Sequence, residues 1–342
     1  MRLSSTLGQI MFAPVRIGVV GFGNFGRLHA QTTTALSETE LVAIVDQRPQ
    51  AIDAARECLP HVPAWTDIDE ALAKSDAEAW VVASSTASHV AIAKKLLTGG
   101  ACVLVEKPIS EDLAEAESLA PLVSNNSANF MAGHIVLFNS EFRQLLDEVQ
   151  RREPIAYIDA VRHRPTTTMQ LFPGESPYHL TMVHDLYCVL ALTNSAEPYT
   201  FSAQSRTTTD GACDLALAQF QWKNGVTASL TASFLTPSGM AGDGFDRLEV
   251  FGCGWSARIH PNPRPIEIWD ERAHWPSALE IRTSTTSPSG MLAEELRCFC
   301  RVVRRIEPVP IGARYADALQ VQRWLDKLDS MRSNSAQETL HC

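Results

Sequence analysis

The stretch VRIGVVGFGNFG, residues 15–26, decides the fold of this chain. Its first six residues form a mostly apolar run of strand length, and three glycines follow in the spacing G-x-G-x-x-G. In such a turn the first glycine permits a tight bend, the second lets the backbone approach a pyrophosphate, and the third allows close packing of helix on strand. The helix that starts there offers unpaired N–H groups to phosphates. The stretch therefore predicts a dinucleotide-binding Rossmann unit.

Strand-like runs and longer amphipathic segments alternate through residues 15–135, a pattern typical of a parallel sheet covered by helices. We therefore predict an α/β fold that begins with a Rossmann domain over residues 15–135, with a parallel, doubly wound sheet, after an N-terminal extension of residues 1–14. After the first strand and a helix ending near Leu36, the predicted strands cover 41–45, 79–83, 101–105 and 129–132, and the predicted helices cover 50–58, 90–97 and 111–123.

The pattern changes beyond Arg152, where strand-like runs follow one another closely. Lys223-Asn224-Gly225 separates two of them with an Asn-Gly hairpin signal. We predict a C-terminal α+β domain over residues 136–330, with a large, mostly antiparallel open sheet, and a flexible tail over 331–342. Its predicted strands cover 155–161, 201–207, 215–222, 226–234 and 247–251, and its predicted helices cover 180–192 and 315–328.

Composition excludes several function classes. The formal net charge of −10 disfavours nucleic acid as a partner, because an acidic surface repels phosphates. No run approaches the 18 or so apolar residues of a membrane span, and the N-terminus has no continuous apolar segment of a signal peptide. The eight cysteines form no Cys-x-x-Cys pair. We therefore expect free thiols in a reducing cytoplasm and no metal site.

Asp46 ends the second predicted strand, twenty residues after Gly26. A carboxylate at this position accepts the ribose hydroxyls of NAD and repels the additional phosphate of NADP. Arg48 lies close enough in sequence to pair with that phosphate. We predict NAD as the cofactor, with NADP as the alternative.

Glu106-Lys107-Pro108 follows the carboxyl end of a predicted strand, where ligands bind in doubly wound sheets. A lysine there would reach the nicotinamide crevice. By position alone, a solvated loop lysine is the competing interpretation.

These features together resemble the glucose-fructose oxidoreductase, inositol dehydrogenase and MocA (Gfo/Idh/MocA) oxidoreductase family. The resemblance runs from Val15 to about Leu328. GHIVLFNS at 133–140 and TMVHDL at 181–186 resemble GHIERFNP and LMIHDI segments of its nucleotide-sugar dehydrogenase branch. The residues that carry the resemblance are Gly21 to Gly26, Asp46, His89, Glu106-Lys107-Pro108, Gly133-His134 and His184-Asp185.

The resemblance implies an NAD-dependent oxidoreductase that transfers a hydride between nicotinamide and a hydroxyl or ketone of a sugar, cyclitol or nucleotide-sugar. It also implies a homodimer or homotetramer formed through the second sheet. Lys107 and His184 would be the catalytic residues, because the hydroxyl proton must leave as the hydride leaves. A core histidine on an apolar helix face is the competing interpretation of His184. The expected cofactor-binding residues are Gly21, Phe22, Gly23, Asn24, Phe25, Gly26, Asp46, Gln47, Arg48, Ser84, Ser85, His89, Glu106, Lys107 and His134.

The sequence also departs from the family pattern. Leu180 stands where the family commonly has an Asp four residues before the catalytic His, and Tyr187 and Leu137 replace a second Asp and an Arg. The usual Pro near Ser85-Thr86 is missing. Substrate contacts are therefore expected from Tyr178, His179 or Asp185. Two other functions remain open: a non-catalytic protein that senses NAD and a sugar, and an NAD-assisted glycoside hydrolase.

Overall fold

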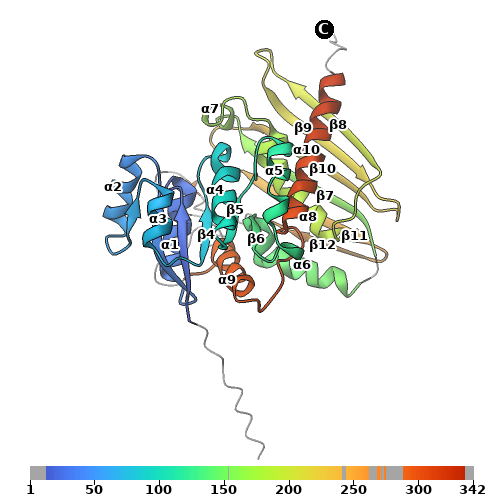
Figure 1. Ribbon diagram of the computed structural model, residues 1–342. Helices are drawn as coiled ribbons and strands as arrows, with labels where there is room; N and C mark the ends of the chain where they lie inside the picture. Colours follow the sequence, from blue (N-terminus) through green and yellow to red (C-terminus); the bar gives the residue numbers. More distant parts are fainter. Residues whose placement is uncertain are drawn as a thin grey trace, which may run out of the picture.

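The computed structural model describes residues 13–152, 154–240, 244–261, 268–269, 271, 273–274 and 288–335. Two six-stranded sheets stand side by side, with helices over and between them (Figure 1). Residues 1–12 and 336–342, which make up most of the predicted extension and part of the predicted tail, lie outside this description. The final helix continues to Ser335, beyond the expected end near Leu328.

The first sheet is entirely parallel, as predicted. Its strands are ordered β3 (Ala64–Trp65), β2 (Thr39–Val45), β1 (Val15–Val20), β4 (Ala79–Val82), β5 (Cys102–Glu106) and β6 (Phe130–Gly133). The strand order reverses direction at β1, so the crevice between β1 and β4 is the switch point where ligands bind. The helices of this half are α1 (Asn24–Ala35), α2 (Pro49–Cys58), α3 (Ile68–Lys74), α4 (Thr86–Thr98) and α5 (Leu113–Glu117).

One predicted helix of this half is shorter than expected. The segment predicted as a helix over 111–123 forms only α5 and a separate 3-10 turn, Ala120–Leu122. Pro121 lies in that turn, and a proline removes a backbone donor and clashes with the preceding helical turn. Strand β3 and helix α3 were not predicted, because two residues of strand carry no periodic signal.

The second sheet is mixed and mostly antiparallel, which confirms the predicted fold class. Its order is β12 (Trp255–Ile259), β11 (Phe245–Gly252), β7 (Ile155–Pro165), β10 (Thr227–Thr236), β9 (Cys213–Gln221) and β8 (Thr200–Thr207). Among the described strands of this second sheet, only the central pair, β7 and β10, is parallel. Strand β12 was not predicted. The predicted hairpin joins β9 and β10, with Gly225 at a φ of 93°.

The strand register shows which side chains share a face of the second sheet. The row Ala218, Leu230, Ala160 and Leu248 is buried and lies toward the helices. The neighbouring row, one residue along each strand, faces the other side because successive side chains alternate. Helix α8 (Val183–Leu192) follows a π-helical turn at Tyr178–Met182, and α6 (Ser140–Gln150) and α7 (Thr168–Leu171) complete the middle of the chain. A two-stranded ribbon pairs β13 (Ile268–Trp269) with β14 (Ala273–His274).

The last two helices return to the first half of the chain. Helix α9 (Met291–Val303) packs on α1, and Arg304 at its end forms an ion pair with Glu78 at 2.7 Å. Helix α10 (Tyr315–Ser335) lies between the two sheets and contacts β6, α8 and β8 (Figure 1).

An aromatic cluster fixes α10 against the second sheet. The fully buried Trp324 packs against Phe220 of β9, Trp222 and Phe201 of β8. Its indole N–H donates to Glu197 Oε2 at 3.0 Å. Buried aromatic side chains contribute large apolar area and restrict geometry, so α10 is held firmly in the space between the sheets.

Candidate active site

The glycine turn joins β1 to α1 at the switch point of the first sheet. Gly21 has a φ of 94°, and a Cβ there would lie 2.5 Å from Ala83 O. A Cβ on Gly26 would lie 2.0 Å from Gly21 O, so only glycine permits the observed approach of helix and strand. The first and third glycines of the motif therefore serve the turn and its packing, as predicted from their spacing.

Gly23, the second glycine of the motif, faces open space instead of neighbouring backbone. A Cβ at Gly23 would meet nothing within 4 Å and would project into open space above the start of α1. A cavity of about 730 Å³ lies there. The backbone N–H groups of the first turn of α1 lack partners within the helix and favour phosphate binding. Of the predicted cofactor residues, those that line this cavity are Gly21, Gly23, Asn24, Phe25, Asp46, Gln47, Arg48, Ser84 and Ser85.

The Asp46 carboxylate closes one end of this cavity. It accepts the Phe22 N–H at 2.8 Å and the Arg48 N–H at 2.9 Å, and the Arg48 guanidinium also binds it through Nε at 3.0 Å. Burial by itself would raise the pKa of Asp46, but these hydrogen bonds outweigh it, so the pKa of Asp46 is lowered. The Asp46 carboxylate is ionised, and the exposed guanidinium of Arg48 partly compensates its negative charge. The cavity thus fits a dinucleotide. It combines the glycine turn and the N-terminus of α1, which suit a pyrophosphate, with the carboxylate of Asp46, which suits a ribose.

Six predicted cofactor residues lie outside the lining of this cavity: Phe22, Gly26, His89, Glu106, Lys107 and His134. Phe22 and Gly26 are buried parts of the turn. His89, also buried, lies with its ring nitrogens 2.9 Å from Pro108 O and 3.1 Å from Ser84 O. It therefore connects the cofactor loop to the loop that carries Lys107. Glu106 points away from the cavity into a buried cluster.

That cluster joins α1, β5 and α9 behind the loop that carries Lys107. Glu106 Oε1 lies 2.8 Å from His29 Nε2, and Glu295 lies close enough that one ligand atom from each of the three falls within 4.8 Å of the others. Glu295 Oε1 accepts the His134 N–H at 2.8 Å, while Oε2 has no hydrogen-bond partner among the residues that the structure describes. Burial and the nearby Glu106 raise the pKa of Glu295 well above its usual value. His29 and Glu295 were not predicted, since each sits singly in a helix without a motif.

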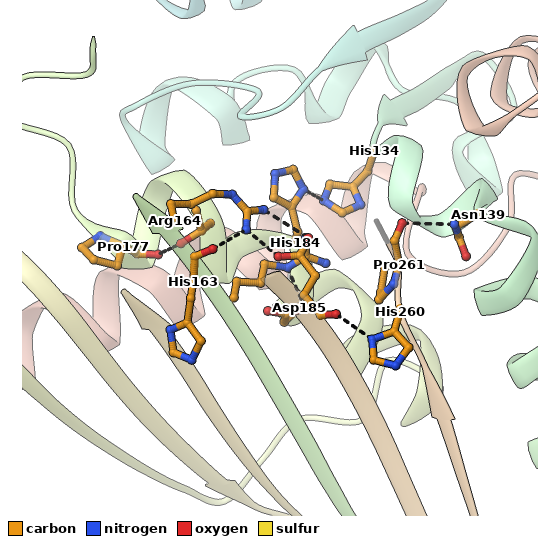
Figure 2. A network of polar contacts seen from close by, with 12 residues as sticks. His134, Asn139, His163, Arg164, Pro177, His184, Asp185, His260 and Pro261 are labelled. Carbon is orange, nitrogen blue, oxygen red and sulfur yellow. Dashed lines mark hydrogen bonds and ion pairs between the residues drawn. The ribbon is translucent and has the colours of Figure 1, made fainter. Parts of the chain in front are cut away.

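His134 and His184 face each other across the interface between the two halves (Figure 2). His184 Nδ1 lies 3.0 Å from His134 Nε2, and His134 stacks on Tyr187 with ring centroids 4.0 Å apart. Burial, with the nearby Lys107 charge, lowers the pKa of both histidines well below the usual value. Burial likewise lowers the pKa of Lys107, against the opposing charges of Glu106 and Glu175. Two neutral imidazoles and a perturbed lysine thus share one electrostatic environment.

Asp185, a predicted substrate contact, is buried in an ion-pair network with β7 and β11 (Figure 2). Its Oδ1 accepts from Arg162 Nε at 2.9 Å, and Arg162 also binds Asp246 at 2.8 Å, which in turn binds Arg164. Burial raises the pKa of Asp185 to about 6. This network fixes the helix that carries His184 to the second sheet. Arg162 was not predicted, because a charged residue on a strand usually indicates solvent exposure.

The two remaining predicted substrate residues differ in placement. The Tyr178 hydroxyl lies 2.7 Å from Gln204 O and 3.0 Å from Leu217 O and shares its one proton between these two carbonyls, so Tyr178 secures the sheet. His179 is exposed and lines a second cavity of about 430 Å³, together with Lys107, Leu180 and Tyr187. His179 Nε2 lies 2.5 Å from Asp329 Oδ2, and this hydrogen bond raises the pKa of His179 despite opposing burial.

Comparison with known proteins identifies the family. Residues 15–134 match the model of the Gfo/Idh/MocA proteins, described as an oxidoreductase family with an NAD-binding Rossmann fold. Over 220 residues the chain is 31% identical to the UDP-N-acetylglucosamine 3-dehydrogenase of Acidithiobacillus ferrooxidans, covering 64% of this chain and 67% of that protein. The chain belongs to the Gfo/Idh/MocA oxidoreductase family. The predicted resemblance and the predicted NAD cofactor are thereby confirmed.

Another Gfo/Idh/MocA relative matches a smaller share of this chain. The inositol 2-dehydrogenase of Rhizobium meliloti is 29% identical over 39% of this chain and 41% of that protein, so the alignment spans less than half of the relative. Two solved structures share the fold over nearly the whole chain. The scyllo-inositol dehydrogenase of Lactobacillus casei, solved with NAD(H) and scyllo-inositol, gives a TM-score of 0.77 at 20% identity, over 94% of this chain and 98% of the other. The Acidithiobacillus enzyme gives 0.73 at 24% identity, over 94% and 99%.

Proposed function

We propose that this Gfo/Idh/MocA protein is an NAD-dependent dehydrogenase that acts on a hydroxyl group of a sugar, cyclitol or nucleotide-sugar, with Lys107 and His184 as its catalytic residues. The contact between His184 and His134 beside Lys107 carries the proposal. Of the two relatives named above by sequence, one is a dehydrogenase of a nucleotide-sugar and the other a dehydrogenase of inositol.

The chemistry of the site supports these roles. Bound NAD would supply an acceptor or donor for the hydride of a carbinol carbon. The part left to the side chains is to hold the hydroxyl group and to take or return its proton. When His184 Nδ1 carries its proton and donates to His134 Nε2, His184 Nε2 is left as an acceptor for that proton. The lowered pKa of His184 keeps the imidazole neutral near pH 7, and Lys107 provides a donor that can hold the substrate oxygen.

The residues of the first cavity hold the cofactor in this proposal. The N–H groups at the start of α1 bind the pyrophosphate above Gly23, and Asp46 binds the adenosine ribose. His89 holds the loop of Ser84 and the loop of Lys107 together, so that cofactor and substrate residues keep a fixed separation.

The test removes each proposed catalytic group in turn. His184→Ala and Lys107→Met are each expected to lower turnover by roughly 10²–10⁴-fold, as for a positioned acid–base group, while NAD affinity stays nearly unchanged. Reduced-nicotinamide absorbance measures turnover, and calorimetry measures NAD binding. His61→Ala, an exposed histidine beside β3, is the control and should retain wild-type activity. Full turnover in His184→Ala would make this histidine structural.

Leu180 favours a second candidate function. It lines the second cavity at the position where the family commonly has an Asp, so this chain lacks one acidic group there. A protein that senses NAD and a sugar without turning the sugar over would tolerate this loss. Binding of a polyol to the NAD-loaded protein, with no reduction of NAD by any sugar or cyclitol tested, would favour the sensor.

We further propose a cytoplasmic homo-oligomer. The seven cysteines among the described residues are all free thiols, which suits a reducing compartment. Among those same residues, no helix is both long and apolar enough to cross a membrane. The face of the second sheet turned away from the helices is the proposed contact between subunits.

A further inference from the structure

The cavity beside Lys107 is built from three elements of the chain. The loop after β5 supplies Lys107 and Glu111, the segment before α8 supplies Glu175 and His179, and α10 supplies Gln322 and Asp326. Leu180, Val183 and Leu325 form an apolar wall. A cavity of about 430 Å³ with one apolar wall and polar groups around it is of a size and kind that suits a small molecule.

The charges around this cavity are mostly negative. Glu111, Glu175 and Asp326 form no ion pair with any residue that the structure describes. His179 is compensated by its bond to Asp329. Apart from the pair of His179 and Asp329, three carboxylates and one cation, Lys107, therefore line the cavity, and the charge of Glu106 also acts on Lys107. Such a field repels an anionic ligand and leaves an uncharged one unaffected.

Gln322 supplies an independent sign of a ligand. The residue is 8% exposed and lines the cavity, and within the described part of the chain its amide makes no hydrogen bond. The amide therefore faces the cavity with its hydrogen-bonding groups open to a ligand. It offers both donors and an acceptor, which suits a hydroxyl group that also donates and accepts. The aromatic cluster around Trp324 holds this part of α10 in place.

We propose that the cavity beside Lys107 selects an uncharged polyhydroxylated substrate through Gln322, and that its three carboxylates exclude sugars linked to a nucleoside diphosphate. This inference rests on the proposed dehydrogenase function and chooses between the two substrate classes of its relatives. Gln322 is a specificity-determining residue in this assignment. The hydroxyls of the substrate satisfy its amide, and the apolar wall packs against the ring.

The experiment compares myo-inositol, scyllo-inositol and glucose with UDP-N-acetylglucosamine on the NAD-loaded protein. Calorimetry measures binding, and reduced-nicotinamide absorbance measures oxidation. We expect at least one uncharged compound to bind and be oxidised in preference to the nucleotide-sugar. Gln322→Leu should weaken binding of that compound by roughly three- to tenfold, the value of one neutral hydrogen bond, with NAD affinity unchanged. Gln320→Leu, on the same helix but bonded to Ser195 O and Glu197, is the matched control and should leave affinity as in wild type.

The carboxylates are tested separately at low salt. Glu175→Gln with Asp326→Asn should strengthen binding of UDP-N-acetylglucosamine by up to about fivefold per charge removed. Preference of the wild type for UDP-N-acetylglucosamine, or absence of binding by every uncharged compound, would overturn the inference. If an uncharged compound binds through Gln322 but nothing reduces NAD, the inference stands and the proposed dehydrogenase function fails. If only the nucleotide-sugar is oxidised, the function stands and the inference fails.

Discussion

At the scale of single residues, Asp46 and Arg48 set the balance between the two nicotinamide cofactors. The carboxylate meets the ribose end of the cavity, yet the guanidinium binds that same carboxylate through two nitrogens, at 3.0 and 2.9 Å. The repulsion that Asp46 exerts on an additional phosphate is therefore reduced by its own neighbour. A sequence comparison of the two side chains alone cannot weigh these effects, because it does not show that they pair.

Variants of this pair should move the cofactor preference in opposite directions. Asp46→Ala should weaken NAD binding by roughly tenfold or more, through loss of charge-assisted hydrogen bonds, and narrow the gap to NADP. Arg48→Ala should widen the preference for NAD, because the cation that attracts the additional phosphate is gone. Calorimetric titration with both cofactors measures the ratio, and the exposed Arg56→Ala serves as the control. A wild-type preference for NADP would contradict this assignment of Asp46.

At the scale of elements, α9 places an acid in the core of the first domain. Glu295 is fully buried, and burial with the charge of Glu106 raises its pKa well above the usual value. The folded state therefore retains a proton that the unfolded chain releases above about pH 4.5. The contribution of Glu295 to stability is therefore fully present below that pH and is lost as pH rises through the folded pKa of Glu295.

Glu295→Gln should remove this part of the pH dependence. The amide oxygen can still accept the His134 N–H, but nothing remains to titrate. Between pH 5 and 8 the Tm of the variant should fall less than that of the wild type. Glu294→Gln, the exposed-side neighbour paired with Arg297, should leave the wild-type slope intact. Equal slopes for Glu295→Gln and wild type would show that Glu295 is ionised in the folded protein.

The elements themselves were largely predictable from local pattern. The glycine turn, the strands of both sheets other than β3 and β12, and the Asn-Gly hairpin each carry a signal within a short window, and the structure has them within a few residues. The parallel pairing of β7 with β10 was not predictable, because it depends on segments far apart in the chain. The candidate site was also only partly predictable. Lys107 and His184 lie in recognisable sequence motifs. The other residues of the site meet their partners or line their cavity only through tertiary packing, and these are His29, Arg162, Glu295 and Gln322.

At the scale of the whole molecule, the second sheet presents one face that the helices leave uncovered. The row of Gln204, Leu217, Thr231, Val161 and Arg247 runs across that face in register. Leu217 and Val161 are only half-buried in the single chain. Apolar side chains in the middle of a broad sheet face are typical of a contact between subunits.

We expect light scattering to show a dimer or tetramer at micromolar concentration. Val161→Glu should shift the protein toward the monomer, because association would bury an unpaired charge. Thr98→Glu adds the same charge at the exposed end of α4 and should leave the assembly unchanged. A monomeric wild type would remove this proposal.

Helices α9 and α10 come late in the chain but pack against its first domain, and this affects the order in which the protein folds during translation. The Ala132 N–H of edge strand β6 donates to Ala313 O at 2.7 Å, and the His134 N–H donates to Glu295. During translation the nucleotide-binding half leaves the ribosome first, yet these partners arrive last. Contacts over such sequence separations are slow to form. The nascent chain therefore keeps this edge of its first sheet without those partners until residues 291–335 emerge, whereas the residues that line the larger cavity, all between 20 and 95, are made much earlier.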